Sequence, residues 1–294
     1  MKLCRYEKEW KSHWGVVEAS PHPSPLPEGE GIVYELVGDP YGECHAGARV
    51  GPLGELKLLA PCTPETIWSL GANYPSRLNE RGFPLPKQPS FAVVPGSCIC
   101  GTGEEIRIPE IETRAEYGVE LGIVVRRDCQ DVEPHEVDDY VLGYTGLNNI
   151  WVKDAVGAEY ARPMRVYDNH CPTGPVVDTS IDPRDLRLRL WVDGELRQDD
   201  RTSSVVFDLR FVVSWLSKRV AIKRGDLIMT GSPGGIEGHV LRYGQTVEME
   251  VEGIGRLCNR VTRVDNAAVS YVVSLERWLE TRRSGGPAVP ASYH

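Results

Sequence analysis

EYGVELGIVVRR (residues 116–127) and DDYVLGYTGLNNIWVKD (residues 138–154) decide how this chain folds. The first stretch reads as a buried strand, because apolar and β-branched residues follow Glu120 closely. The second is another apolar strand, and it ends in the polar pair Asn148-Asn149. Buried acids and amides are costly unless they have hydrogen-bond partners. Two strands that both carry such groups therefore predict a site, although an ordinary sheet whose polar ends reach water has the same pattern.

Length, composition and charge narrow the class of protein. With 294 residues, 41% hydrophobic and 26% charged, the chain suits a soluble globular protein with one large or two small domains. The net charge of -9 argues against nucleic-acid binding, and no apolar run reaches membrane-spanning length. The N-terminal residues lack an apolar signal core, so we expect a cytoplasmic protein. Its eight scattered cysteines should then be reduced thiols, and their spacing does not resemble a zinc site.

Composition divides the chain into three expected parts. Residues 1–66 read as an N-terminal leader and a small β-rich region, because residues 21–31 are rich in proline and glycine. Residues 67–266 form the main domain, and residues 267–294 a C-terminal helix with a mobile tail.

Short strands and hairpins dominate the main domain. Residues 186–198 alternate apolar and polar and contain Asp193-Gly194, which fits a type I′ hairpin turn. Residues 245–264 form another hairpin, whereas residues 206–218 have apolar positions at helical spacing. The sequence therefore predicts a mostly β fold with some α, built as a mixed sheet or barrel-like roll.

Polar residues follow two further strands. Residues 66–75 are an apolar strand, and Arg77 and Glu80 after it would share one face if their segment is helical. Residues 224–235 are a strand that runs into a loop in which Thr230 and Ser232 offer hydroxyls and backbone N–H groups. Such a loop can hold a carboxylate or an oxyanion, but it can equally be a plain turn.

These motifs, taken in order, resemble the fumarylacetoacetate hydrolase superfamily from about Leu58 to Val264. The matching motifs are LGANY (70–74), PGS (95–97) followed by IRIP (106–109), EYGVELGIVV (116–125), GYTGLNNIWVKD (143–154), YDNHCPTGP (167–175), DGELRQ (193–198) with Thr202, and GDLIMTGSP (225–233). The resemblance implies the family's β-roll catalytic domain over residues 67–266, usually in a homodimer. It also implies hydrolysis, decarboxylation, hydration or tautomerisation of small oxo acids, with Mg²⁺ held by three carboxylates.

The chain departs from the family pattern at the metal ligands. Gly118 stands where the first acid belongs and Asn149 where the third belongs, so Glu120 is the only matching ligand retained. The family's histidine is replaced by Arg77, whereas its paired acid remains as Glu80.

These replacements change the expected chemistry of the site. A divalent cation needs several anionic oxygen ligands, so we expect no cofactor, with weak Mg²⁺ binding as the alternative. Arg77, and Arg165 in place of a family lysine, could supply positive charge instead. Val94 replaces a second family lysine. Arginine binds carboxylates and enolates but cannot act as a general base, which makes hydrolysis the less expected reaction.

The first hypothesis is a metal-independent enzyme that binds a small or polyketide-like oxo or enol compound and stabilises its enolate. Cyclisation, dehydration, isomerisation and decarboxylation fit this description. Arginines would bind anionic oxygens, Glu80 or Glu120 would move a proton, and amides and hydroxyls would hold the enolate. The candidate catalytic residues are Arg77, Glu80, Glu120, Asn149 and Arg165, and the candidate substrate-binding residues are Tyr74, Asp168, Gln198, Thr230 and Ser232.

Two other hypotheses stay open. One is a Mg²⁺-dependent hydrolase, hydratase or decarboxylase of the usual kind. In it Glu116 would partly replace the missing acid, from the same strand face but about 7 Å further along. The other is a ligand-binding or scaffold protein that has lost catalysis.

Overall fold

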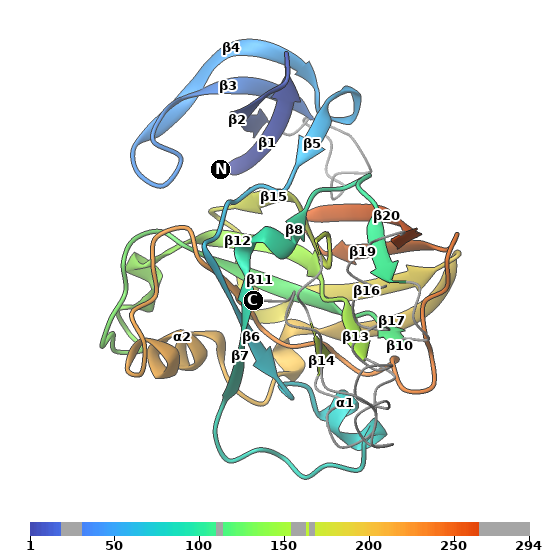
Figure 1. The fold of residues 1–294 in the computed structure, drawn as a ribbon. Helices are drawn as coiled ribbons and strands as arrows, with labels where there is room; N and C mark the ends of the chain where they lie inside the picture. The colour runs from blue at the N-terminus through green and yellow to red at the C-terminus, as the bar shows by residue number, and fades with distance from the viewer. Residues whose placement is uncertain (19–30, 110–113, 154–162, 165–167, 265–294) are drawn as a thin grey trace, which may run out of the picture.

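The computed structural model of the chain describes residues 1–18, 31–109, 114–153, 163–164 and 168–264. Within these residues the chain is mostly β-strand, with two short α-helices (Figure 1). This confirms the mostly β fold expected from the short alternating segments. The expected C-terminal helix and tail lie outside the described residues.

One mixed sheet runs through the molecule in the order β4-β3-β2-β1-β15-β12-β11-β18-β6-β7. Two short strands branch from it, β5 beside β1 and β8 beside β15. Its strands are β1 (Lys2–Lys8), β2 (Lys11–Glu18), β3 (Ile32–Gly38), β4 (Cys44–Pro52), β5 (Lys57–Leu59), β6 (Thr66–Gly71), β7 (Ser90–Pro95), β8 (Ile99–Cys100), β11 (Val119–Val125), β12 (Val141–Asn148), β15 (Cys171–Asp178) and β18 (Leu227–Met229).

A second sheet packs against the β11–β12 region, in the order β17-β16-β19-β20-β9. Its strands are β9 (Ile106–Pro109), β16 (Arg187–Val192), β17 (Glu195–Arg201), β19 (Thr246–Val251) and β20 (Gly255–Val264). Alternating buried residues of β16 and β19 share one hydrophobic cluster with β11, so the core lies between the two sheets. A small third sheet contains β10 (Arg114–Glu116), β13 (Trp151–Lys153) and β14 (Pro163–Met164).

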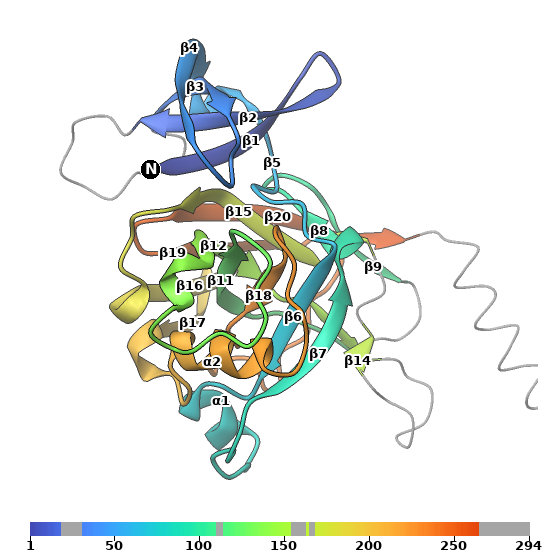
Figure 2. The ribbon, with the colours of Figure 1, turned by 90° about the vertical axis from the view of Figure 1, so that its left-hand side faces the viewer.

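The first strands form a unit that stands beside the main body in two perpendicular views (Figures 1 and 2). The ladder between β1 and β15, with Leu3 opposite Val177, joins this unit to the long sheet. The expectation of a leader was therefore wrong for residues 1–18, which form the β1–β2 hairpin. Its turn residues Glu9 and Trp10 have φ of 53° and 62°.

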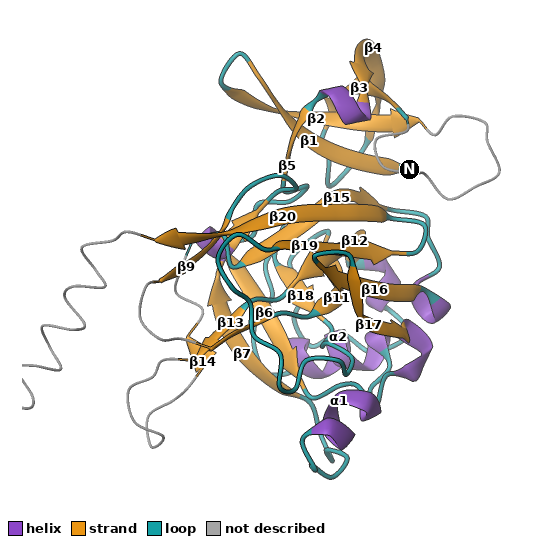
Figure 3. Cartoon of the chain, turned by 90° about the vertical axis from the view of Figure 1, so that its right-hand side faces the viewer, coloured by secondary structure: helices purple, strands orange, loops and turns teal. Residues whose placement is uncertain are grey.

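The two α-helices lie at the end of the body away from this N-terminal unit (Figure 3). α1 (Pro75–Glu80) begins with a proline, which is favoured in the first helical turn. α2 (Leu209–Ser217) begins after Asp208, whose side chain accepts hydrogen bonds from the first free N–H groups of the helix. α2 was expected from the sequence, as was the β16–β17 hairpin with its positive φ at Asp193 and Gly194, whereas α1 was considered only as a possible helix.

No helix in the described part of the chain is long and apolar enough to cross a membrane. All eight cysteines are described and none forms a disulfide, as expected for reduced thiols. Six of them are buried.

Candidate active site

Neighbouring strands of the long sheet bring the candidate residues together. β11 pairs antiparallel with β12, so that Val119 faces Asn148, and antiparallel with β18 on its other side. β6 runs parallel to β18, and α1 follows β6 directly. Four segments therefore meet at the same ends of these central strands: the start of β11, the end of β12, α1 and the loop after β18.

Glu120 lies at the centre of this group of segments. Its side chain is buried, with only 1% of the residue exposed. Its Oε1 accepts hydrogen bonds from Asn149 Nδ2 at 2.6 Å and from Ser232 Oγ at 2.7 Å. Its Oε2 accepts one from the backbone N–H of Gly231 at 2.8 Å. Both carboxylate oxygens thus accept hydrogen bonds from the protein, which offsets the cost of burying them.

Asn149 is fixed on both its backbone and its side chain. Its N–H donates to the carbonyl of Gly118 at 2.8 Å, and the neighbouring Asn148 accepts from the Gly118 N–H. The amide nitrogen of Asn149 faces Glu120, because two oxygens without a hydrogen between them would repel at that distance. Asn149 Oδ1 and the Tyr74 hydroxyl are buried without a hydrogen-bond partner in the described residues. Burial, with Asp200 and Glu120 nearby, raises the pKa of Tyr74 well above its usual range.

Arg77 lies among three carboxylates. Its guanidinium is 3.1 Å from Glu80, 3.4 Å from Glu116 and 3.6 Å from Glu237. The side chains of Arg77 and Glu116 are 12% and 9% exposed, whereas those of Glu80 and Glu237 are 27% and 53% exposed. Glu116, which the sequence offered as a substitute metal ligand, here pairs with the guanidinium.

The loop after β18 is bound tightly to the residues around it. The second oxygen of Glu80 accepts from the Gly235 N–H, and Ser76 Oγ accepts from the Gly234 N–H at 3.0 Å. The Tyr117 hydroxyl donates to the Gly235 carbonyl, and burial raises the pKa of Tyr117 to about 12. A cavity of about 380 Å³ opens between α1, β17 and this loop, with Glu80 in its wall.

Two predicted substrate-binding side chains use their donors inside the protein. Gln198 donates to the carbonyls of Pro233 and Gly234 and accepts from the Val119 N–H at 2.9 Å. Thr230 Oγ1 donates to the Leu121 carbonyl at 2.8 Å. In this structure both residues position the strand and the loop. Direct contact of either residue with substrate stays a prediction, and it would require these internal hydrogen bonds to break.

Two further candidates, the predicted substrate-binding Asp168 and the predicted catalytic Arg165, are not among the contacts just described. Asp168 is an exposed residue in a turn before β15, without a described contact to Glu120 or Arg77. Arg165 lies outside the described residues.

The residues around these strand ends do not fit a metal site with three carboxylate ligands. Among the described residues Glu120 is the only acid at its centre, and its oxygens accept hydrogen bonds from an amide, a hydroxyl and a backbone N–H. An ideal Cβ built on Gly118 would lie 2.1 Å from Ser232 Oγ, so Ser232 occupies the space of a side chain at this position. Across the described residues there is no group of three or more His, Cys, Asp or Glu side chains able to hold a metal ion.

Sequence reasoning missed several residues that build the site. Ser76, Tyr117 and Glu237 were not singled out, because their contacts are made with segments far away in the chain. Asn73 could have been found, since it stands in the LGANY motif. It is fully buried, donates to the Thr230 carbonyl and accepts from the Phe207 N–H.

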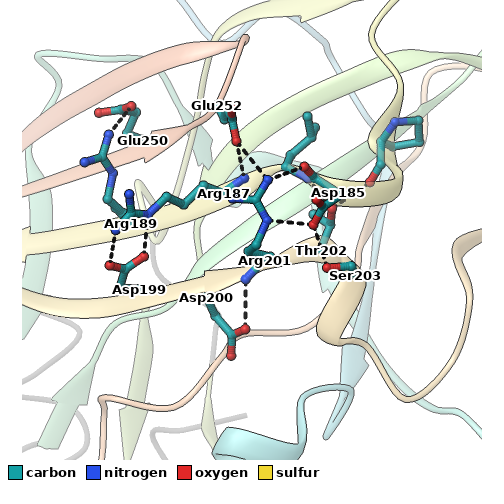
Figure 4. Close-up of polar contacts among 12 residues, drawn as sticks. Asp185, Arg187, Arg189, Asp199, Asp200, Arg201, Thr202, Ser203, Glu250 and Glu252 are labelled. Carbon is teal, nitrogen blue, oxygen red and sulfur yellow. Dashed lines mark hydrogen bonds and ion pairs between the residues drawn. The ribbon is translucent and has the colours of Figure 1, made fainter.

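A larger charged network lies on β16, β17 and β19 (Figure 4). Arg187 pairs with Asp199, Arg189 with Glu250, and Arg201 with Asp185 and Glu252. Most of these side chains are about a third to a half exposed, and ion pairs of this kind contribute little to stability. The network lies on a solvated sheet face.

The fold and the site define a β-roll enzyme scaffold with a buried acid at the converging strand ends. A family model described as fumarylacetoacetate (FAA) hydrolase, C-terminal, matches residues 66–262, and one described as Rv2993c-like, N-terminal, matches residues 1–61. The chain belongs to the fumarylacetoacetate hydrolase family, as the order of its motifs predicted.

Several proteins to which the chain is similar are named as enzymes. The crystal structure of 2-hydroxyhepta-2,4-diene-1,7-dioate isomerase from Mycobacterium marinum has a TM-score of 0.79 and 31% identity, over 90% of this chain and 100% of that one. Oxaloacetate tautomerase fahd2, mitochondrial, from Xenopus laevis is 31% identical over 70% of this chain and 68% of its own. A bifunctional isomerase/decarboxylase of 4-hydroxyphenylacetate degradation from Salmonella dublin is 34% identical over 69% of this chain and 48% of its own. These likenesses support an enzyme.

Proposed function

We propose that this protein catalyses proton transfer at the carbon next to a carbonyl group of a small oxo or enol compound, without a divalent cation. Isomerisation is the first reaction to test, because similar proteins are named as isomerases or a tautomerase. Decarboxylation, dehydration and cyclisation pass through the same enolate. The observation that carries the proposal is Glu120, whose carboxylate is bound by three donors of the protein itself.

Arg77 is the group proposed to bind the oxygen that becomes negative. A guanidinium can form two parallel hydrogen bonds with a carboxylate or enolate. Glu116 and Glu80 hold it in place from two sides. A preorganised donor of this type contributes roughly 3 kcal/mol to the stability of an enolate-like transition state.

Glu80 is the group proposed to carry the proton. It is more exposed than Glu120, and the Gly235 N–H and Arg77 fix its two oxygens. Glu120 is buried under three hydrogen bonds and is therefore assigned to hold the site together. The two acids that the sequence left as alternative proton carriers thus have different proposed roles: Glu80 moves the proton and Glu120 holds the site together.

The test is turnover of enolisable 2-oxo acids, beginning with oxaloacetate and 2-hydroxydienoates, by protein dialysed against a chelator. The proposal expects interconversion of the keto and enol forms that neither chelator nor added Mg²⁺ changes. Glu80→Gln should lower kcat roughly 10²–10⁴-fold, the usual effect of losing a general acid or base. The exposed acid Glu195, replaced by Gln, is the matched control and should leave kcat unchanged.

Two results would overturn the proposal. Activity that disappears with chelator and returns with Mg²⁺ would show an ordinary metal-dependent member of the family. Binding of oxo compounds without turnover of any of them would show a ligand-binding protein. Assembly as a homodimer and a cytoplasmic location stay predictions.

A further inference from the structure

Asp200 is an acid on the inner face of β17, the last strand in the order of the second sheet. In the β16–β17 ladder Leu188 lies opposite Asp200, and Leu190 lies opposite Gln198. Both leucines are fully buried, and residues directly opposite each other in an antiparallel pair point to the same side of the sheet. Asp200 and Gln198 therefore share the face that turns towards the interior. A carboxylate on such a face is costly unless its charge is compensated.

Among the described residues, Asp200 is held by two neutral donors and by no cation. Its Oδ1 accepts from the Arg201 backbone N–H and its Oδ2 from the Ser76 hydroxyl, both at 2.8 Å. In Figure 4 its carboxylate points away from the guanidinium groups of the charged network. The neighbouring Asp199 differs, because its two oxygens bind Arg187 at 2.7 and 2.6 Å. Asp200 therefore keeps a negative charge that no basic side chain in the described part of the chain balances.

The cavity of about 380 Å³ beside α1 has both Asp200 and Glu80 in its wall. Ser76, in the first turn of α1, belongs to the same wall, where its hydroxyl donates to Asp200 and accepts from the Gly234 N–H at 3.0 Å. Ligand pockets typically have volumes of about 300–1,000 Å³, so this cavity can hold a small ligand. A substrate that presents a carbon to Glu80 would place its next group in the cavity with Asp200.

The electrostatics of the cavity favour one kind of group at that place. Burial, with Asp200 as the next cause, raises the pKa of the Tyr74 hydroxyl, so the charge of Asp200 also acts on the interior of the site. Arg197 is the basic residue of the described wall, and its guanidinium pairs with Glu195 at 2.7 Å. In the described wall, no basic group without an acidic partner remains to bind a second carboxylate of a ligand, and Asp200 would repel one.

We propose that Asp200 selects the substrate: the group next to the enolised carbon carries a hydrogen-bond donor, a hydroxyl or an ammonium, rather than a second carboxylate. A donor would bind the Asp200 carboxylate, whereas a second carboxylate would face a like charge. This inference rests on the proposed proton transfer by Glu80 and names the class of substrate, an oxo or enol acid with a donor at its far end. It does not depend on the partners of Glu120.

The experiment compares two enolisable acids that differ at one end. 4-Hydroxy-2-oxobutanoate ends in a hydroxymethyl group, and oxaloacetate ends in a carboxylate. By calorimetry, wild-type protein should bind the hydroxy acid about tenfold more tightly, and kcat/KM should show the same preference. Asp200→Asn should tighten the binding of oxaloacetate and weaken that of the hydroxy acid, so that the preference disappears. The wild-type preference should also shrink as salt is raised, because salt screens the repulsion.

Two further variants separate the charge of Asp200 from its other contacts. Ser76→Ala removes the hydrogen bond to Asp200 but keeps the charge, so the preference for the hydroxy acid should persist. Glu252→Gln removes one acid of the charged network, which pairs with Arg201 at 3.4 Å, and it keeps an oxygen for the Arg187 N–H. This control should leave the preference unchanged.

Several results would overturn the proposal. They are equal affinity of the wild type for the two acids, a preference that salt does not change, and a preference that Asp200→Asn leaves intact. Loss of the preference in Ser76→Ala to the same degree would show that the shape of the cavity decides. Binding without turnover, with the preference present, would contradict the proposed proton transfer but not the role of Asp200. Binding of neither acid by the folded wild type would overturn both.

Discussion

In the described part of the site, the single positive charge of Arg77 lies beside three carboxylates. Glu116 is buried beside it and Glu80 is fixed by the Gly235 N–H, so neither can move easily. Glu237 is the most exposed of the three and lies farthest from the guanidinium, at 3.6 Å. An anionic substrate that binds Arg77 would therefore displace Glu237 first.

Glu237→Gln should strengthen the binding of an anionic substrate. The loss of one carboxylate removes an exposed ion pair, whose weight is at most about 1 kcal/mol, so KM should fall up to about fivefold. The value of kcat should hardly change, because Glu237 has no proposed part in proton transfer. Steady-state kinetics at low salt would measure this, with Glu195→Gln as control. An unchanged or raised KM would show that substrate does not compete with Glu237.

Glu120→Gln should destabilise the protein although it keeps the shape of the side chain. One carboxylate oxygen becomes an NH₂ group that faces a donor of the protein, either Gly231 or Asn149 and Ser232. An unsatisfied buried donor costs about 1–3 kcal/mol. Chemical denaturation would measure this loss. Glu35→Gln, at an exposed position of β3, should be neutral, and equal stabilities of the two variants would contradict this account of Glu120.

At the scale of elements, the sequence revealed those whose turns carry the usual residues. The β16–β17 hairpin was predicted from Asp193-Gly194 and α2 from its apolar spacing, and both are present. The β1–β2 hairpin was missed because Glu9 and Trp10 form its turn. Neither residue normally favours positive φ, so the pattern contained no turn signal.

The site could be predicted only in part, for a related reason. The motifs identified Glu120, Arg77 and Glu80 as candidate catalytic residues. The role of Ser232 depends on a contact with Glu120 across 112 positions of the chain, and that of Gln198 on backbone groups 35 positions away or more. Such pairings follow from the tertiary fold, and no local spacing encodes them.

Gln198→Ala should loosen the loop after β18. The variant leaves the Val119 N–H without its acceptor and frees the carbonyls of Pro233 and Gly234. We expect a loss of about 1–3 kcal/mol in the free energy of unfolding and faster hydrogen exchange at residues 231–235. Gln245→Ala removes similar bonds from an exposed turn and should cost less. Unchanged exchange in the loop would contradict the positioning role of Gln198.

At the scale of the whole molecule, the burial of thiol and phenol groups makes the free energy of unfolding depend on pH in the alkaline range. Burial raises the pKa of Cys4 and of Cys62 to about 12, and that of Cys129 to about 11. It also raises the pKa of Tyr41 and Tyr144 to about 12. The folded chain therefore keeps protons that the unfolded chain, with thiol pKa values near about 8.5, has already released.

The contribution of these buried groups to the free energy of unfolding should consequently be constant below about pH 8. It should fall as the pH rises from about 9 to 12. Each such group contributes a slope of about 1.4 kcal/mol per pH unit between its two pKa values. Urea unfolding at several alkaline pH values would measure the slope. Cys4→Ala should make it shallower, and stability that rises over this range would refute the explanation.

The most direct measurement is a calorimetric titration of the wild-type protein with Mg²⁺ and Mn²⁺, together with thermal unfolding in each metal. The account predicts no saturable binding and no shift, because Asn149, Ser232 and Gly231 already satisfy Glu120. A metal at one hundred times its dissociation constant would stabilise the folded state by about 2.7 kcal/mol, which such unfolding detects easily. Tight binding of one metal per chain would contradict the metal-free site.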